Sequence, residues 1–200
     1  AASDGDMENC SMKIARMQVG TGSTYAVSAS DGSWTPVSEA GVGATTLPEI
    51  TAQYAALAAL AGRATGSIKE PKLLHPALGT GKILAIGRNY AAHASELGNA
   101  RPAAPMIFSK FTSSINDPFG VIEVNSRLTK QSDYESELAL VIGRKAKLVS
   151  PTVAMQYVFG YAVANDVSAR DAQDADGQFD RSKGFDTFCP IGPWITTADE

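Results

Sequence analysis

Cysteine and histidine are scarce in this sequence, with two of each among 200 residues. Two cysteines and two histidines do not form a spacing typical of a zinc site. Cys10 lies in an N-terminal stretch that we interpret as a tail, so a structural disulfide with Cys189 is not expected. This cysteine usage fits a reducing environment, and we expect a cytoplasmic protein.

Long apolar runs and clusters of basic residues are also missing. No stretch approaches the ~18 apolar residues of a membrane span. The first residues lack the basic and apolar regions of a signal peptide. The net charge is −4 and the isoelectric point is about 5.2, with no run of arginine or lysine. These features argue against a nucleic acid or a membrane as partner.

The apolar content of 44% is enough for one core, or for one domain with a small appendage. We interpret residues 1–11 as a disordered or non-native tail and place a boundary near residue 70. Residues 12–70 predict a small antiparallel sheet domain, with strands at 12–20, 23–30 and 33–40 followed by a helix over 47–62.

Residues 71–200 contain more strand patterns than helix patterns. Strands are expected at 82–87, 105–111, 136–147 and at the end of the stretch 150–166, with another entered through the turn-rich stretch 186–200. A loop and short helix are expected over 88–98. Few helices separate the strands, so the sequence favours an α+β, mostly β fold over a doubly wound one.

Two glutamates of the stretch DYESELALVIG, Glu135 and Glu137, stand at the start of its strand pattern. Residues two apart on a strand point the same way, about 6.6 Å apart at ~3.3 Å per residue. The residues that follow are apolar on both faces, so we expect a strand covered on both sides. Either the two carboxylates face water, or a hard cation lies between them.

Asp166 ends a second apolar strand in the stretch YVFGYAVANDVSARD. It is either the N-cap of the segment that follows or a third carboxylate for the same cation. Three carboxylates without histidine or cysteine suit Mg²⁺, Mn²⁺ or Ca²⁺ rather than zinc.

Five stretches in this order, AIGRNYAAHASELG, PMIFSKFTSSI, DYESELALVIGRKAK, YVFGYAVANDVSARDAQ and RSKGFDTFCPIGPW, resemble the fumarylacetoacetate hydrolase family. The likeness covers residues 82–200 and is nearest to the short-chain bacterial branch that includes acylpyruvases. It implies a mixed β-roll domain, usually dimeric, that acts on 2-oxo or 2,4-dioxo carboxylates. It also implies that Glu135, Glu137 and Asp166 bind Mg²⁺ or Mn²⁺, with Ca²⁺ as a substitute in crystals.

The resemblance also implies roles for residues outside the metal site. His93 and Glu96, three apart on the short helix, match the dyad that activates water, and Gly87 and Gly98 would let this segment close over substrate. Lys183 matches a lysine that assists catalysis. Gln173, Arg88 and Lys110 are expected to contact substrate. Arg170 and Asp171 are interpreted as a local ion pair or cap. Without the resemblance, His93 with Glu96 would be an incidental surface pair and Lys183 a solvated lysine.

The expected activity is hydrolysis of a carbon–carbon bond in acylpyruvate-like 2,4-dioxo acids, through a metal-bound enolate. The alternatives on the same site are oxaloacetate decarboxylase, 2-hydroxyhepta-2,4-diene-1,7-dioate isomerase or decarboxylase, and ureidoglycolate lyase. A non-catalytic metal-binding scaffold is the alternative from another class. Family members continue beyond the point that corresponds to Glu200, so a missing C-terminal part of the catalytic domain is expected.

Overall fold

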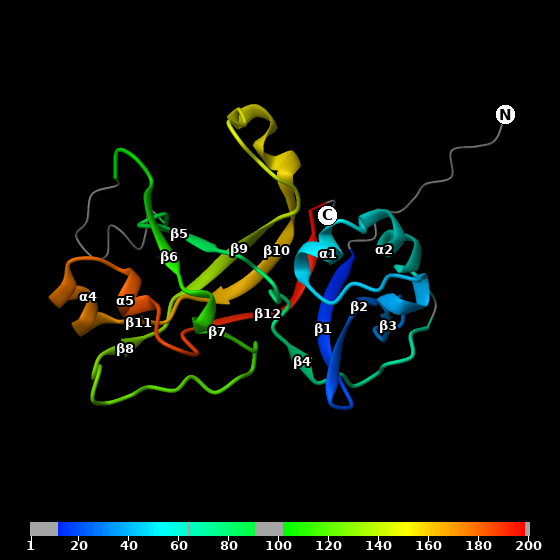
Figure 1. Ribbon diagram of the computed structural model, residues 1–200, viewed down its shortest axis with the longest axis horizontal. Helices are drawn as coiled ribbons and strands as arrows, with labels where there is room; N and C mark the ends of the chain where they lie inside the picture. Colours follow the sequence, from blue (N-terminus) through cyan, green and yellow to red (C-terminus); the bar gives the residue numbers. More distant parts are fainter. Residues whose placement is uncertain (1–11, 64, 91–101, 199–200) are drawn as a thin grey trace.

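The computed structural model describes residues 12–63, 65–90 and 102–198 (Figure 1). The predicted tail over residues 1–11 lies outside the described residues. So does most of the predicted helix over 88–98. In the part of the chain that is described, no helix has both the length and the apolar character needed to cross a membrane.

The first three strands form an antiparallel meander, as predicted. They are β1 (Lys13–Val19), β2 (Gly22–Ser28) and β3 (Trp34–Pro36). Ala15 pairs with Ala26 in the β1–β2 register, and both are fully buried. Gly20 lies in the turn between them with a φ of 56°, a conformation that glycine adopts without strain. A 3₁₀ helix, η1 (Val37–Ala40), follows β3.

The predicted single helix over 47–62 is two helices, α1 (Leu47–Thr51) and α2 (Tyr54–Leu60). Glu49 supports the start of α1, because its Oε2 accepts hydrogen bonds from the backbone N–H groups of Thr45 and Thr46 at 2.8 and 3.1 Å. The helix ends at Thr51 because Gln53, with φ −112° and ψ 23°, leaves the helical region.

The rest of the chain is mainly short strands. They are β4 (Leu73–Leu74), β5 (Ile83–Gly87), β6 (Met106–Lys110), β7 (Ile115–Asn116), β8 (Ser132–Asp133), β9 (Ser136–Ile142), β10 (Val158–Asn165), β11 (Ser168–Ala169) and β12 (Cys189–Thr197). The helices are η2 (Thr112–Ser114), η3 (Pro151–Tyr157), α4 (Arg170–Asp176) and α5 (Asp180–Lys183).

One sheet joins the two ends of the described chain. Its order is β3-β2-β1-β12-β10-β9, with β4 on β1 and β7 on β12. In Figure 1 the red strand β12 lies between the blue strands on one side and the golden β10 and yellow-green β9 on the other. The largest cluster of buried apolar side chains lies on this sheet under α1 and α2, and its members include Ile14, Tyr25, Leu57, Phe159 and Ile195.

The expectation that β9 is covered on both sides is wrong. Leu138, Leu140 and Ile142 are about half exposed, whereas Ala139 and Val141 pack against the main core. Within the described residues β9 is the outermost strand of its sheet and pairs only with β10. Its outer face therefore has no layer above it among these residues.

The fold class predicted from the sequence is confirmed. The chain is α+β and mostly β, and nearly all of its strand pairs are antiparallel. The division into 12–70 and 71–200 stays a prediction, and the central sheet runs across that boundary through the pairing of β1 with β12.

Candidate metal and substrate site

The β9–β10 ladder brings Glu135 and Asp166 together. In an antiparallel pair, the end of one strand lies beside the start of the other. Glu137 pairs with Ala164, and the backbone N–H of Asp166 donates to the carbonyl of Glu135 at 2.9 Å. A spacing of 31 positions in sequence thus becomes a direct contact at one end of the sheet.

Lys183, the last residue of α5, joins these two carboxylates. Its Nζ donates to Oε1 of Glu135 at 2.9 Å and to Oδ2 of Asp166 at 2.6 Å. Both Lys183 and Asp166 are buried. Asp166 is therefore not the N-cap of the following helix, and Glu135 does not simply face water.

Lys110, the last residue of β6, approaches Asp166 on its other oxygen. Its Nζ lies 2.8 Å from Oδ1 of Asp166. Burial lowers the pKa of Lys110, and the nearby Asp166 opposes this by favouring the charged ammonium. The two lysines thus place two cations around one buried carboxylate.

Arg170 is a site residue that the sequence analysis misassigned. Its Nη2 lies 2.7 Å from Asp133 and 2.8 Å from Glu135, and its Nη1 donates to Gln173 at 3.4 Å. Asp171 instead accepts hydrogen bonds from Thr129 and from the backbone N–H of Lys130. The β8–β11 pairing sets Ser168 opposite Asp133 and thereby brings Arg170, just after β11, within reach of Asp133, and sequence spacing alone gives no signal of that pairing.

Glu135 and Glu137 have opposite pKa shifts. Burial alone would raise the pKa of Glu135, but Lys183 and Arg170 outweigh it and hold this pKa below its ordinary value. Burial raises the pKa of Glu137, and the negative charges of Glu135 and Asp166 raise it further. A hydrogen bond with the side chain of Tyr90 opposes that rise. Glu137 is thus the carboxylate of the cluster whose negative charge is least compensated.

Two observations fit a divalent cation at this site. Glu135, Glu137 and Asp166 offer only oxygen donors, which hard cations prefer. Oδ1 of Asp166 is buried and, among the described residues, has no hydrogen bond of ordinary geometry, although Lys110 is close. Among the described residues, however, no three histidine, cysteine, aspartate or glutamate side chains are already arranged to hold a metal ion. The lysines supply the positive charge instead.

Two of the predicted residues cannot be placed. His93 and Glu96 lie outside the described residues, so the dyad stays a prediction. Arg88, just before that segment, is exposed and has a φ of 55°, which is uncommon for a residue other than glycine. Among the predicted substrate contacts, Gln173 accepts a hydrogen bond from Arg170, which in turn contacts Glu135.

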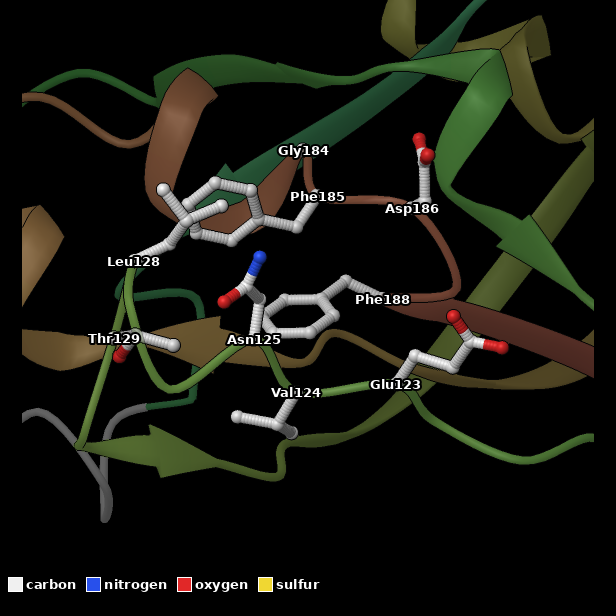
Figure 2. A pocket seen from close by; sticks show the side chains of 9 residues that line it. All are labelled: Glu123, Val124, Asn125, Leu128, Thr129, Gly184, Phe185, Asp186 and Phe188. Atoms are coloured by element: carbon white, nitrogen blue, oxygen red, sulfur yellow. The ribbon is translucent and has the colours of Figure 1, made fainter.

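A pocket of about 430 Å³ lies beyond the turn that follows Lys183 (Figure 2). The rings of Phe185 and Phe188 form one side in edge-to-face contact, with centroids 5.4 Å apart. Glu123 and Asp186 also line the pocket. The described lining includes none of the clustered carboxylates or lysines, so this pocket is not the predicted site.

Comparison with known families gives a match over more than half of the chain. The family model described as fumarylacetoacetate (FAA) hydrolase C-terminal matches residues 82–200. The chain belongs to this family. The members of this family are enzymes, both hydrolases and isomerases, and they generally use a divalent metal ion.

Relatives with known structures share the fold. A fumarylacetoacetate hydrolase from Exiguobacterium antarcticum is 36% identical with a TM-score of 0.78, and the match covers 94% of this chain and 67% of that one. A 5-carboxymethyl-2-hydroxymuconate delta-isomerase from Mycobacterium smegmatis is 35% identical with a TM-score of 0.70, covering 94% and 66%.

The chain spans about half the length of the curated relatives it matches. Protein Rv2993c of Mycobacterium tuberculosis is 45% identical over 130 residues, which are 65% of this chain and 48% of that protein. A Burkholderia cenocepacia relative is 50% identical over 121 residues, or 43% of its length.

Proposed function

We propose that this chain provides the metal and substrate site of an enzyme that hydrolyses a carbon–carbon bond in acylpyruvate-like 2,4-dioxo acids. The observation that supports this most is the contact of Glu135 and Asp166 with Lys183 in a buried setting, next to Glu137. Three carboxylates held together cost electrostatic energy, and such groupings concentrate at functional sites.

Glu135, Glu137 and Asp166 would hold the divalent ion, which we expect to be Mg²⁺ or Mn²⁺. When bound, the ion would supply positive charge beside the oxygens of a 2-oxo acid, where negative charge develops as the bond breaks. The raised pKa of Glu137, caused by burial and by its two acidic neighbours, fits a carboxylate whose charge an added cation would stabilise.

The residues of the chain have separate tasks in this proposal. His93, oriented by Glu96, takes a proton from water, and the oxygen adds to the 4-keto carbon. The bond between carbons 3 and 4 then breaks, its electron pair forms the enolate of pyruvate, and a proton returns to carbon 3. Lys183 places a fixed positive charge near that enolate. Arg170 and Gln173 orient the substrate carboxylate.

A second candidate is isomerisation of a 2-hydroxy-2,4-diene diacid. It is favoured by the names of similar structures, the delta-isomerase from M. smegmatis and a 2-hydroxyhepta-2,4-diene-1,7-dioate isomerase from Mycobacterium marinum, which is 31% identical with a TM-score of 0.66. Both reactions pass through an enolate, so the same carboxylates and Lys183 would serve either.

We also propose that the enzyme acts as a homodimer.

Thermal unfolding with and without Mn²⁺ tests the site. For the wild-type chain we expect Mn²⁺ to raise the melting temperature, and oxalate, which mimics the pyruvate enolate, to raise it further only with Mn²⁺. A ligand at ~100 times its dissociation constant stabilises the folded state by ~2.7 kcal/mol. Glu137→Gln should lose the Mn²⁺ response, while Glu70→Gln, at an exposed glutamate, should keep it.

The same variant has a second, opposite effect without metal. The pKa of Glu137 is higher in the folded chain than in the unfolded one, so its ionisation destabilises the fold as the pH rises above the ordinary glutamate pKa. Glu137→Gln should therefore melt slightly higher than wild type at pH 7 without Mn²⁺.

A wild-type chain whose melting temperature does not change with Mn²⁺ would contradict the proposal. Release of pyruvate from acetylpyruvate, against isomerisation of a dienoic diacid, separates the two reactions.

A further inference from the structure

Lys110 has an unusual environment for a lysine. Its side chain is 2% exposed. Its Nζ donates to the carbonyl oxygens of Phe188 at 2.8 Å and Val167 at 3.3 Å, and it lies 2.8 Å from Oδ1 of Asp166. An ammonium group has three protons. The two carbonyl oxygens accept two of them, and Oδ1 of Asp166 is the ion-pair partner of the ammonium group. The buried Nζ therefore has little room left for a substrate.

Lys183 differs from Lys110 in its hydrogen-bond partners. The partners of Lys183 Nζ are the side chains of Glu135 and Asp166. Two of the partners of Lys110 are main-chain carbonyls, one just after β10 and one just before β12. Lys110 is thus held by the backbone. One carboxylate oxygen of Asp166 lies next to this cation, and the other accepts from Lys183, which also donates to Glu135.

We propose that Lys110 is a positioning residue that fixes the side chain of Asp166 and turns its Oδ2 toward the other carboxylates. This inference rests on the proposed function, since it concerns how one carboxylate is presented to the cation. It replaces the expected substrate contact of Lys110 with a role that acts through Asp166. Partners of metal-binding carboxylates typically alter metal affinity 10- to 100-fold when they are removed.

Two variants of the full chain test this role. Lys110→Met keeps the length of the side chain and removes the charge and all donors. Lys110→Gln is shorter and uncharged but can still donate to a carbonyl, so it is the variant less prone to misfolding. Lys145→Met, at an exposed lysine, is the matched control.

Two measurements follow on each folded variant. Crystal structures without metal should show Asp166 in a different side-chain conformation in the Lys110 variants and unchanged in Lys145→Met. Mn²⁺ titration, followed by electron paramagnetic resonance of the free ion, should show a dissociation constant 10- to 100-fold higher for the Lys110 variants and unchanged for the control.

The outcomes distinguish this inference from the proposed function. An unmoved Asp166, or wild-type Mn²⁺ affinity with a raised KM, would overturn the positioning role and favour substrate contact. If neither variant unfolds cooperatively, Lys110 serves the fold itself and the positioning role is rejected. If the wild-type chain does not bind Mn²⁺, the proposed function fails, while the conformation of Asp166 still decides what Lys110 does.

Discussion

Buried charges in this molecule come with partners of opposite sign. Asp166 is close to Lys110 and Lys183, and Glu135 is close to Lys183 and Arg170. Taking charges out of water costs several kcal/mol per ion unless close partners offset the cost. Such a group of charges is poor evidence for added stability. Such grouped charges are more typical of a functional site.

His75 is a buried titratable group outside the site. Its Nδ1 is buried and has no hydrogen-bond partner among the described residues. Its backbone N–H donates to Asp117 at 2.8 Å, and its carbonyl accepts from Arg16 at 3.3 Å. Burial lowers the pKa of His75, the charge of Arg16 lowers it further, and Asp117 opposes both. The folded chain therefore holds His75 in its neutral form.

We predict that the free energy of unfolding falls as the pH drops below 6.5, the ordinary histidine value. The unfolded chain takes up the proton first, because its histidine has the higher pKa, so acid favours unfolding until the pH passes the lower folded value. Urea unfolding between pH 7.5 and 5 measures this slope. His75→Gln should flatten it, whereas His93→Gln, at the other histidine of the chain, should not. Equal slopes in all three proteins would contradict the prediction.

Part of the candidate site could be predicted from single residues and their spacing. The alternation of a strand places Glu135 and Glu137 on one side, and only Glu137 keeps an uncompensated charge there. The contact with Asp166 depends on the β9–β10 register, and the one between Arg170 and Glu135 on the β8–β11 pairing. Pairings between distant strands leave no trace in local spacing. The residues alone therefore left Asp166 open between an N-cap and a third carboxylate, and Arg170 was assigned to a local ion pair or cap.

At the level of elements, the strands were easier to predict than the helix. The apolar patterns at 82–87, 105–111 and 136–147 correspond to β5, β6 and β9, because a strand needs only a few alternating or apolar residues. The alanine-rich stretch 47–62 has high helix propensity throughout, yet it breaks at Gln53. Propensity is a weak preference that packing overrides, and a two-residue break cannot be seen in it.

The pairing of β10 with β12 depends on a glycine. A methyl group at Gly160 would collide with the carbonyl oxygen of Thr196 and would lie 2.8 Å from Cγ2 of Ile195. Gly160→Ala should therefore push the two central strands apart and lower the free energy of unfolding by about 1–3 kcal/mol, as overpacking usually does. Urea denaturation measures this difference.

Gly43→Ala is the matched control for that substitution. A methyl group at Gly43 meets nothing within 4 Å, and its φ is not in the left-handed region. Its change in unfolding free energy should stay within about 0.5 kcal/mol. Similar losses in both variants would show that the β10–β12 contact is not as close as described.

At the scale of the whole molecule, the central sheet connects regions that the sequence suggested were separate. The turn-rich stretch 66–82 reads as a connection, and it predicts a boundary between two domains near residue 70. Yet β1 pairs with β12 through Lys13–Thr196 and Ile14–Ile195, and Tyr25 belongs to the same buried cluster as Phe159. Composition reports local character, whereas a shared core depends on which strands meet.

We predict that residues 71–200, expressed without residues 1–70, do not fold cooperatively. Removal of β1, β2, α1 and α2 would expose Phe159, Ile191 and Ile195, which are now buried in the main core. It would also leave β12 with an open edge, and such an edge favours aggregation. Far-ultraviolet circular dichroism during urea unfolding, compared with the full chain under the same conditions, measures cooperativity. A sharp transition in the shorter chain would mean that the boundary near residue 70 separates two independent domains, and that the β1–β12 pairing joins them without being needed by either.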